Sequence, residues 1–359
     1  MPELIDLGGG LRRALEASGE RAICELCALM RELLGGDDRV VGLRRLNARV
    51  LRADIADGVP WRAVVLKRLD PAVAQRNRLL ATRWLPALGL QDRCARLLGA
   101  AAERRAECVW HVYEDLGDET LAVRPDPERI RAALELVADL HTRAAHHAVL
   151  PDVRRYGSSL GPQYFAENVR DAVDALDALA ASGLETPREY AGVSSRLRDR
   201  LVALLADGPR RARVAAESAG PDTLLHGDLW PINIFVATTA GGPRARLVDW
   251  DRLGVGSFSY DLSTFLFRLP AASRPEILEH YRNAVARAGW RLASPADLDV
   301  LFDTAERARY ANSVIWPVQA LLAERADWGF PQLAEIEGWF LDLDSTAPTR
   351  TGPRGGDVG

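Results

Sequence analysis

Three oxygen-bearing side chains border a predicted hairpin in one short segment of the chain: Asp228, Asn233 and Asp249. Apolar strand residues flank Asn233 and Asp249, and the turn between the two strands brings these two residues together. Amide and carboxylate oxygens are ligands that Mg²⁺ accepts, and phosphate oxygens of a substrate commonly complete its shell. The segment therefore predicts a Mg²⁺ site with a further carboxylate, Asp228, beside it.

A single lysine is the second candidate. Lys67 is the only lysine among 46 Lys and Arg residues, so arginine fills every other basic position. It follows Val64-Val65-Leu66 at the end of a predicted strand. A compact ammonium suits contact with a phosphate better than a bulkier, planar guanidinium does. We therefore expect position 67 to be functional rather than a solvated strand end.

Hydrophobic periodicity predicts the elements that position these residues. A leading helix is expected over 11–34, then strands over 45–54, 61–67, 95–101 and 108–113, with a turn at Asp57-Gly58 and a helix over 75–85. Later helices are expected over 127–146, 164–181, 193–205, 274–288, 296–324 and 331–343, with a hairpin of strands 232–236 and 246–249 among them. A small antiparallel sheet followed by a mostly helical part is an α+β plan.

Composition excludes several classes of protein. An apolar share of 48% is that of a globular chain, and a net charge of -4 argues against a nucleic-acid binder. No apolar run is long enough to span a membrane, and the first residues do not resemble a signal peptide. Four cysteines, including Cys24 and Cys27 on the leading helix, favour buried thiols over a zinc site. These features predict a cytoplasmic protein.

One block of motifs is highly specific. His226-Gly227-Asp228-x4-Asn233, with the downstream Val248-Asp249-Trp250 and Tyr260-Asp261-Leu262, closely resembles the aminoglycoside phosphotransferase and choline kinase family. The resemblance covers roughly residues 40–345 and implies small-molecule kinase activity on a bilobal, protein-kinase-like fold. It implies a nucleotide-binding lobe over 1–113, a catalytic and acceptor-binding lobe over 114–344, and a tail over 345–359.

The resemblance implies a role for each residue of this block. Asp228 would receive or orient the proton of the acceptor hydroxyl. Asn233 and Asp249 would hold Mg²⁺ against the β- and γ-phosphates. His226 and Asp261 would brace the catalytic loop.

Weaker upstream motifs imply the nucleotide contacts. Lys67 would contact the α- and β-phosphates of ATP or GTP. The Tyr113 carbonyl and the Asp115 amide would bind the purine edge, next to Val112, a gatekeeper small enough to admit either base. In the turn that would cover the phosphates, Asn47 and Arg49 are the candidate contacts, with Arg45 as the alternative source of positive charge.

Two departures from the family pattern are visible. Kinases of this fold pair the strand lysine with a glutamate on the following helix, but this helix reads Gln75-Arg76-Asn77-Arg78-Leu79-Leu80, with Arg78 at the expected position. Either another residue pairs with Lys67, or the nucleotide alone holds it. The phosphate-covering turn, residues 42–49, has a single glycine, at its start, so fewer backbone amides are free to fold over phosphate.

The acceptor stays open. An antibiotic hydroxyl is favoured, and a choline-like alcohol or a sugar is the alternative, as is a catalytically weak nucleotide-binding protein. Asp303 and Glu306 are either solvated charges or acceptor contacts. A protein kinase is disfavoured because only 11 residues separate Asp249 from Asp261, and a metallohydrolase because the loop offers few ligands. The chain is expected to act as a monomer or a homodimer.

Overall fold

The computed structural model describes residues 3–7, 10–36, 39–58, 60–103 and 107–344. Two compact units make up the chain: unit 1 comprises Met1–Leu136 and Ile232–Asp251, and unit 2 comprises Val137–Pro231 and Arg252–Gly359. The lobe boundary predicted at residue 113 is a different division and stays a prediction, and the predicted tail over 345–359 lies outside the described residues. None of the described helices combines the length and the apolar character needed to cross a bilayer.

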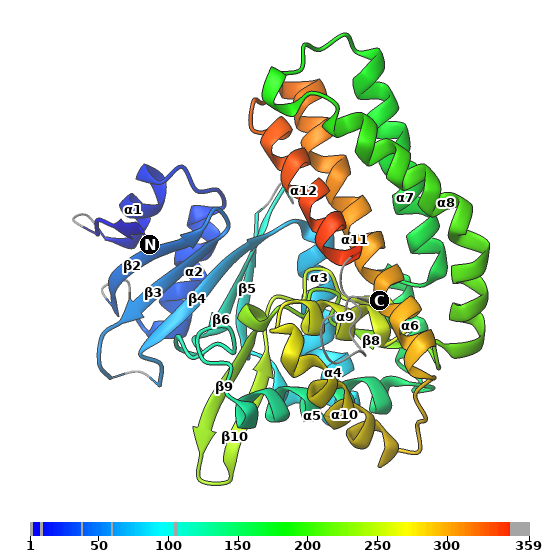
Figure 1. Ribbon diagram of the computed structural model, residues 1–359. Helices are drawn as coiled ribbons and strands as arrows, with labels where there is room; N and C mark the ends of the chain where they lie inside the picture. The colour runs from blue at the N-terminus through cyan, green and yellow to red at the C-terminus, as the bar shows by residue number, and fades with distance from the viewer. Residues whose placement is uncertain (1–2, 8–9, 37–38, 59, 104–106, 345–359) are drawn as a thin grey trace. The chain divides into compact units, whose positions relative to one another are not determined.

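A six-stranded antiparallel sheet forms the centre of unit 1 (Figure 1). Its spatial order is β1-β2-β3-β4-β6-β5. The bounds are β1 Glu3–Ile5, β2 Val40–Asn47, β3 Val50–Ile55, β4 Ala63–Leu69, β5 Leu97–Ala102 and β6 Val109–Glu114. One face of β3 is fully buried because alternate residues point into the core. The predicted antiparallel sheet is confirmed.

The strand predicted over 45–54 is wrong in one respect. The chain reverses inside it, so that Asn47 on β2 pairs with Val50 on β3. The alternating pattern continues across this tight turn, and sequence periodicity therefore did not reveal it. The Asp57-Gly58 turn does join β3 to β4, with Gly58 at a φ of 100°.

Two helices replace the single leading helix predicted over 11–34. They are α1 Leu11–Ala17 and α2 Ile23–Leu34, separated by a turn that contains Gly19 at a φ of 69°. Both bury apolar side chains against the sheet, as Leu15 and Leu26 do. Cys24 on α2 is exposed, which corrects the prediction of buried thiols there, whereas Cys94 and Cys108 are buried.

The helix predicted over 75–85 extends in both directions. It begins at Pro71 as α3 Pro71–Leu79, passes through a π-helical turn, η2 Leu80–Trp84, and ends as α4 Leu85–Ala87. Proline is well tolerated in the first turn of a helix, as at Pro71. Pro86 lies in α4, directly after the π-helical turn, and the helix continues through it. This helix places Asn77, a buried polar residue, close to the sheet.

The predicted hairpin also belongs to unit 1. Strands β9 Ile234–Thr239 and β10 Gly242–Leu247 pair antiparallel, with Ile234 opposite Leu247. The amide of Val248 donates to the carbonyl of Asn233 at 3.0 Å. This register brings Asn233 and Asp249 to the same end of the hairpin, which confirms the predicted arrangement.

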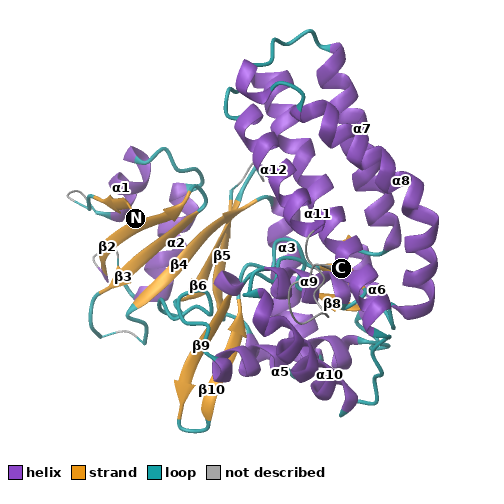
Figure 2. Cartoon of the chain, viewed as in Figure 1, coloured by secondary structure: helices purple, strands orange, loops and turns teal. Residues whose placement is uncertain are grey.

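Unit 2 is mostly helical (Figure 2). Its long helices are α7 Pro162–Ala181, α8 Val193–Ser218, α11 Pro295–Glu324 and α12 Gly329–Asp344, which lie side by side around a shared apolar core. Helix α8 is longer than predicted and runs through Pro209, as α11 runs through Pro317. The other elements are the end of α5 Pro127–Ala144, α6 Leu150–Tyr156, α9 Ser259–Phe267, α10 Arg274–Ala286 and the sheet β7 Ser158–Ser159, β11 Gly254–Gly256 and β8 Thr223–Leu225.

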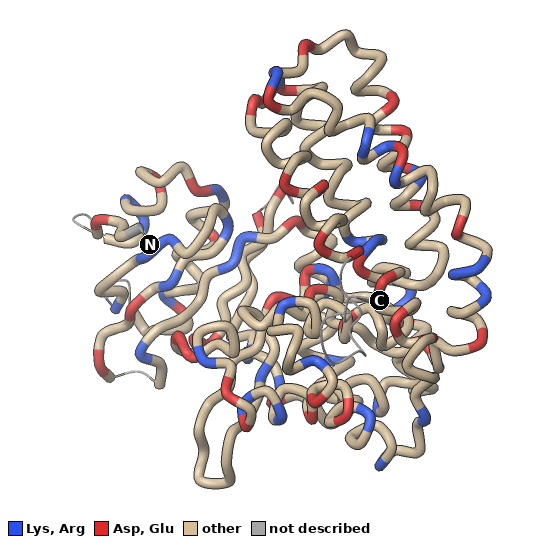
Figure 3. The backbone as a smooth tube through the Cα atoms, in the orientation of Figure 1, with Lys and Arg blue, Asp and Glu red and all other residues tan. Residues whose placement is uncertain are grey.

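Acidic and basic residues are interspersed along both units (Figure 3). Many form arginine–carboxylate pairs at the surface, such as Arg196 with Glu337 and Arg154 with Asp222. Exposed pairs of this kind each contribute roughly 0–1 kcal/mol. They therefore matter less to the fold than the few buried carboxylates described below.

Candidate active site

Lys67 meets two carboxylates in unit 1. Its Nζ lies 2.7 Å from Asp249 Oδ1 and 2.8 Å from Asp251 Oδ1. The lysine side chain is 12% exposed, so these ion pairs are better shielded from water than surface pairs. Strand β4 holds the lysine against β6, where His111 is its cross-strand partner. The structure therefore joins two residues that the sequence predicted separately, Lys67 and Asp249.

Asp249 adopts an unusual backbone conformation. Its φ is 63°, in the left-handed region that aspartate tolerates better than most residues other than glycine. It directly follows the segment that leaves β10, and its side chain is 44% exposed although it contacts Lys67. Strained conformations of this kind are often found at functional sites.

The donors at this end of the hairpin suit a hard cation. Asn233, which is buried, contributes an amide oxygen, and Asp249 contributes a carboxylate. Oxygen donors of these two kinds fit Mg²⁺, whereas a structural zinc site wants cysteine and histidine.

Strand β6 carries the predicted nucleotide-edge residues. Val112 is a residue of this strand with a fully buried side chain, and Tyr113 follows it near the end of the strand. The Tyr113 hydroxyl lies 2.9 Å from His111 Nδ1, and burial raises the pKa of Tyr113 well above its ordinary value. Asp115 follows the last residue of β6, Glu114, and its Oδ2 accepts from Arg52 Nη2 at 2.6 Å. Tyr113 and Asp115 are thus each held by a side-chain hydrogen bond.

Asn47 and Arg49 lie in the tight turn between β2 and β3. Both are exposed, and Asn47 Oδ1 accepts from the Arg49 amide at 2.8 Å. Arg49 Nη1 is 3.4 Å from Asp70 Oδ2 at the start of α3. The Asn47 side chain therefore stabilises the turn itself, while the Arg49 guanidinium forms an exposed ion pair.

The loop that carries Asp228 is held by Asp261 in unit 2. Asp261 is fully buried on α9, and its two oxygens accept from the backbone amides of His226 at 2.7 Å and Gly227 at 2.8 Å. The Asp228 amide in turn donates to His226 Nδ1 at 3.3 Å. Two consecutive backbone amides bound by one carboxylate fix the direction in which the loop leaves β8.

Gly227 makes this geometry possible. Its φ is 81°, and a Cβ at this position would lie 1.9 Å from the carbonyl oxygen of Arg252. A side chain would therefore need both a strained backbone and a displaced neighbour. The glycine of the His-Gly-Asp motif is required by the close approach of these two segments.

His141 is a support residue that sequence reasoning missed. It is fully buried, and its Nε2 lies 3.3 Å from Asp261 Oδ2. Its Nδ1 lies 2.8 Å from the hydroxyl of Tyr281 on α10. Because an ionised carboxylate only accepts, Nε2 donates its proton to the hydrogen bond with Asp261. Spacing along α5 could not identify partners more than a hundred residues away.

The charge of Asp261 is favoured by these donors. Burial would raise the pKa of Asp261, but the hydrogen bond and charge of His141, with His226 and the Gly227 amide, hold it below the ordinary value. The carboxylate therefore stays ionised and continues to accept from the backbone of the loop that carries Asp228.

Asp251 and Asn77 are the other residues that the sequence did not single out. The Asn77 amide donates to Asp251 Oδ1 at 2.8 Å, the same oxygen that contacts Lys67. The sequence does contain a signal for Asp251, because it is a second carboxylate two positions after Asp249.

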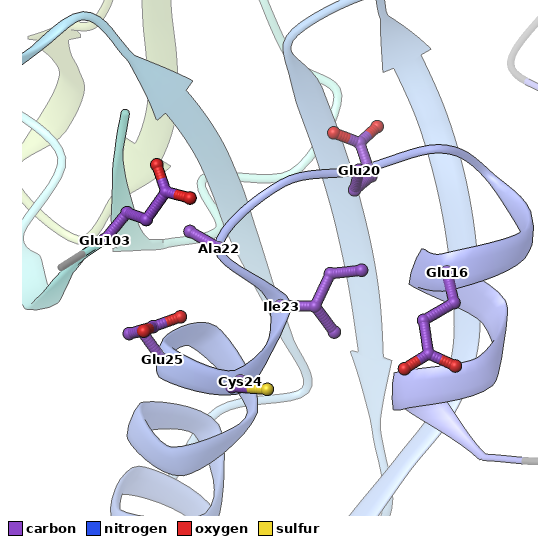
Figure 4. Close-up of a pocket in the computed structure, with 7 residues that line it drawn as sticks. All are labelled: Glu16, Glu20, Ala22, Ile23, Cys24, Glu25 and Glu103. Atoms are coloured by element: carbon purple, nitrogen blue, oxygen red, sulfur yellow. The ribbon is translucent and has the colours of Figure 1, made fainter. Parts of the chain in front are cut away.

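A hollow elsewhere in unit 1 contains none of the predicted site residues. It lies around the turn between α1 and α2 and is lined by Glu16, Glu20, Ala22, Ile23, Cys24, Glu25 and Glu103 (Figure 4). Glu20 is committed to ion pairs, since its oxygens accept from Arg45 and Arg68 at 2.8 and 2.7 Å. The hollow is a feature of the packing between these helices and the sheet.

Comparison with known proteins identifies the family. Residues 43–296 match the family described as the phosphotransferase enzyme family, which is more than half of the chain. The chain belongs to this family. It is a phosphotransferase whose acceptor is an alcohol group, as the motif block predicted. No curated protein matches the chain in sequence.

Solved structures share the fold at low sequence identity. A spectinomycin phosphotransferase in complex with ADP and spectinomycin is 11% identical, with a TM-score of 0.56 over 89% of this chain and 98% of that one. An aminoglycoside 2'-phosphotransferase in complex with GDP is 15% identical, with a TM-score of 0.56 over 88% and 99%. A choline/ethanolamine kinase family protein from Mesorhizobium loti is 15% identical, with a TM-score of 0.53 over 91% and 96%. The kinase-like α+β fold is thereby confirmed.

Proposed function

We propose that this phosphotransferase moves the γ-phosphoryl group of ATP or GTP to a hydroxyl of a small molecule, with an antibiotic as the favoured acceptor. The observation that carries the proposal is the ion pair between Lys67 and Asp249, 2.7 Å apart in a unit that also holds Asn233. Phosphoryl transfer needs a cation at the phosphates, a metal-binding carboxylate and a base in fixed positions, and little else from the protein.

Each proposed role follows from a residue's chemistry. Lys67 contacts the α- and β-phosphates, and Asn233 and Asp249 are the residues that would hold Mg²⁺, which neutralises charge on the phosphates when bound. Asp228 orients the acceptor hydroxyl and takes its proton. His226 and Asp261 support the loop on which Asp228 lies.

The purine contacts are proposed for the end of β6. The Tyr113 carbonyl and the Asp115 amide bind the base edge, and the small Val112 side chain admits adenine or guanine. Nucleotides of both kinds are named in complexes of proteins with this fold, which supports a nucleotide co-substrate without distinguishing ATP from GTP. Asn47 and Arg49 cover the phosphates, with the arginine charge replacing some of the missing backbone amides.

Side chains near the catalytic loop in unit 2 favour an acceptor of low positive charge. The Arg268 guanidinium lies 4.2 Å from the ring centre of Trp230, two positions after Asp228. Glu306, which was left open as a solvated charge or an acceptor contact, is fully buried and accepts from Arg268 and Arg309. Its carboxylate is therefore already neutralised by two arginines.

Asp303, the other carboxylate left open, is similarly committed. It accepts from Arg211 at 2.6 Å and from Arg307 at 2.8 Å. Asp303 and Glu306 are thus both already paired with arginines, and neither offers a free negative charge to a polycationic aminoglycoside. A neutral or weakly basic antibiotic, such as a macrolide or a nucleoside, fits these charges better.

A mass-shift screen tests the proposal. The purified chain is incubated with MgCl₂, ATP or GTP, and a panel of macrolides, nucleosides, aminoglycosides, spectinomycin, choline, ethanolamine and sugars. We expect a product one phosphoryl group heavier from a neutral or weakly basic antibiotic. A phosphorylated alcohol or sugar with no antibiotic product would replace the antibiotic by a metabolite. Nucleotide binding with no product in any class would favour the nucleotide-binding protein.

A further inference from the structure

The family's lysine partner on the helix is missing, and the structure fills its place with two residues. Asp251 Oδ1 lies 2.8 Å from Lys67 Nζ. Asn77 on α3 is 4% exposed, and its amide donates to that same oxygen at 2.8 Å. Arg76, on the same helix, donates to the backbone carbonyl of Asp251. The helix therefore reaches the lysine through one intervening carboxylate.

We propose that Asn77 and Asp251 are positioning residues that together replace the helix glutamate: Asn77 fixes the Asp251 carboxylate, and Asp251 fixes the Lys67 ammonium for contact with nucleotide phosphate. The inference rests on the phosphate contact proposed above for Lys67. Helix α3 then orients the lysine even though it has no acidic residue between Gln75 and Leu80.

Charge explains why the helix contributes an amide. Lys67 already faces two carboxylates, Asp249 and Asp251. A glutamate at position 77 would add a third negative charge beside Asp251 and repel it. Asparagine offers an N–H donor instead, so it attracts the Asp251 carboxylate and leaves the charge of the cluster unchanged.

The two carboxylates are not equivalent. Asp249 is 44% exposed and has a strained backbone, whereas Asp251 is 31% exposed and is tied to α3 through both its side chain and its carbonyl. If Asp249 turns to a metal–nucleotide complex, Lys67 keeps Asp251 as its partner. The lysine then remains in place while nucleotide binds.

Nucleotide affinity tests the inference without knowledge of the acceptor. The dissociation constants of ATP and GTP are measured by calorimetry, with MgCl₂ and again with EDTA, for the wild type and for Lys67→Ala, Asn77→Leu, Asp251→Asn and the double variant N77L/D251N. The matched control is Glu107→Gln, which breaks an exposed ion pair with Arg21 in the same unit. Asn77→Ser provides a second variant, too short to reach Asp251, if leucine prevents folding.

We expect Asn77→Leu and Asp251→Asn each to raise the dissociation constant at least about ten-fold, the size of one lost hydrogen bond to a charged group. The double variant should bind no more weakly than Asp251→Asn alone, because both changes break one chain of contacts. The loss should persist in EDTA, since it acts through Lys67 and not through a metal. Glu107→Gln should bind as the wild type does.

The variants distinguish the positioning role of Asn77 and Asp251 from the phosphate contact proposed for Lys67. Wild-type affinity in Lys67→Ala would contradict the proposed phosphate contact itself. Weakened binding in Lys67→Ala with wild-type affinity in Asn77→Leu, Asn77→Ser and Asp251→Asn would overturn the positioning role alone. Additive losses in the double variant, or a loss confined to MgCl₂, would also overturn it.

Discussion

Gly227 and Asp261 determine how the proposed base is presented. The close approach of Gly227 to the Arg252 carbonyl leaves no room for a Cβ, and Asp261 binds the amides on either side of the bend. Removing the carboxylate would leave two buried amide donors without their acceptor, at a cost of about 1–3 kcal/mol each. The direction of the loop that carries Asp228 therefore depends on a buried carboxylate more than thirty positions away in the sequence.

Burial in the sheet changes the ionisation of His111. Burial lowers its pKa from 6.5 to about 4; Asp251 opposes this shift, while Lys67 and Arg78 add to it. The side chain is 1% exposed and is hydrogen-bonded to Tyr113. At neutral pH it is therefore an uncharged histidine across the sheet from a charged lysine.

This shift predicts that stability falls in mild acid. The unfolded chain binds a proton at His111 below pH 6.5, but the folded chain does so only near pH 4, so the contribution is complete above pH 6.5 and is lost as pH falls toward 4. Between pH 7 and pH 5 the loss is about 2 kcal/mol.

Urea unfolding at several pH values measures this loss, with His111→Gln as the comparison. The free energy of unfolding of the wild type should fall more steeply with acid than that of the variant. Parallel curves for the two proteins would show that His111 titrates alike in the folded and unfolded states.

At the scale of elements, the segment between α1 and α2 connects the leading helices to the sheet. Glu20 lies in this segment with a side chain that is 3% exposed, and it pairs with Arg45 on β2 and Arg68 on β4. Glu16, on α1, is 50% exposed and pairs with Arg12 one helical turn away. The two glutamates line the same hollow but differ in burial (Figure 4).

Glu20→Gln should destabilise the protein by about 3–5 kcal/mol, because it leaves two partly buried arginines without their carboxylate. Glu16→Gln is the matched control and should cost less than about 1 kcal/mol, as expected for an exposed pair. Chemical denaturation of both variants measures the difference. Equal effects would mean that the buried pairs do not anchor the helices to the sheet.

Elements with a local signal could be predicted from the sequence. The hairpin of β9 and β10 was found because its strands alternate, and its register then placed Asn233 near Asp249. The break between α1 and α2 was missed, although Gly19 marks it, because the apolar positions before and after the break keep helical spacing. The turn at Asn47 was missed for the same reason, since alternation runs from β2 into β3.

Residues held by distant partners could not be predicted in this way. Asn77 and Asp251 are 174 positions apart, and His141 and Tyr281 are 140 apart. No spacing along one helix reports such contacts. Asp228, Asn233 and Asp249 were identified because a single short motif contains them, while the residues that orient Lys67 and Asp261 come from elsewhere in the chain.

At the scale of the whole molecule, the proposed roles divide between the two units. Lys67, Asn233 and Asp249 belong to unit 1, whereas Asp228 and Asp261 belong to unit 2. The chain passes from one unit to the other between Pro231 and Ile232, three residues after Asp228. Nucleotide binding and proton transfer can therefore be tested by separate variants, since the residues proposed for each fold in different units.

The central claim is that Asp228 takes part in phosphoryl transfer to a small-molecule hydroxyl. Its most direct test is the turnover of Asp228→Ala with the acceptor found by mass shift, alongside the dissociation constant of ATP. We predict that kcat falls by about 10²–10⁴-fold, as for a lost acid–base group, while ATP binds with wild-type affinity. Wild-type turnover in Asp228→Ala would contradict the account.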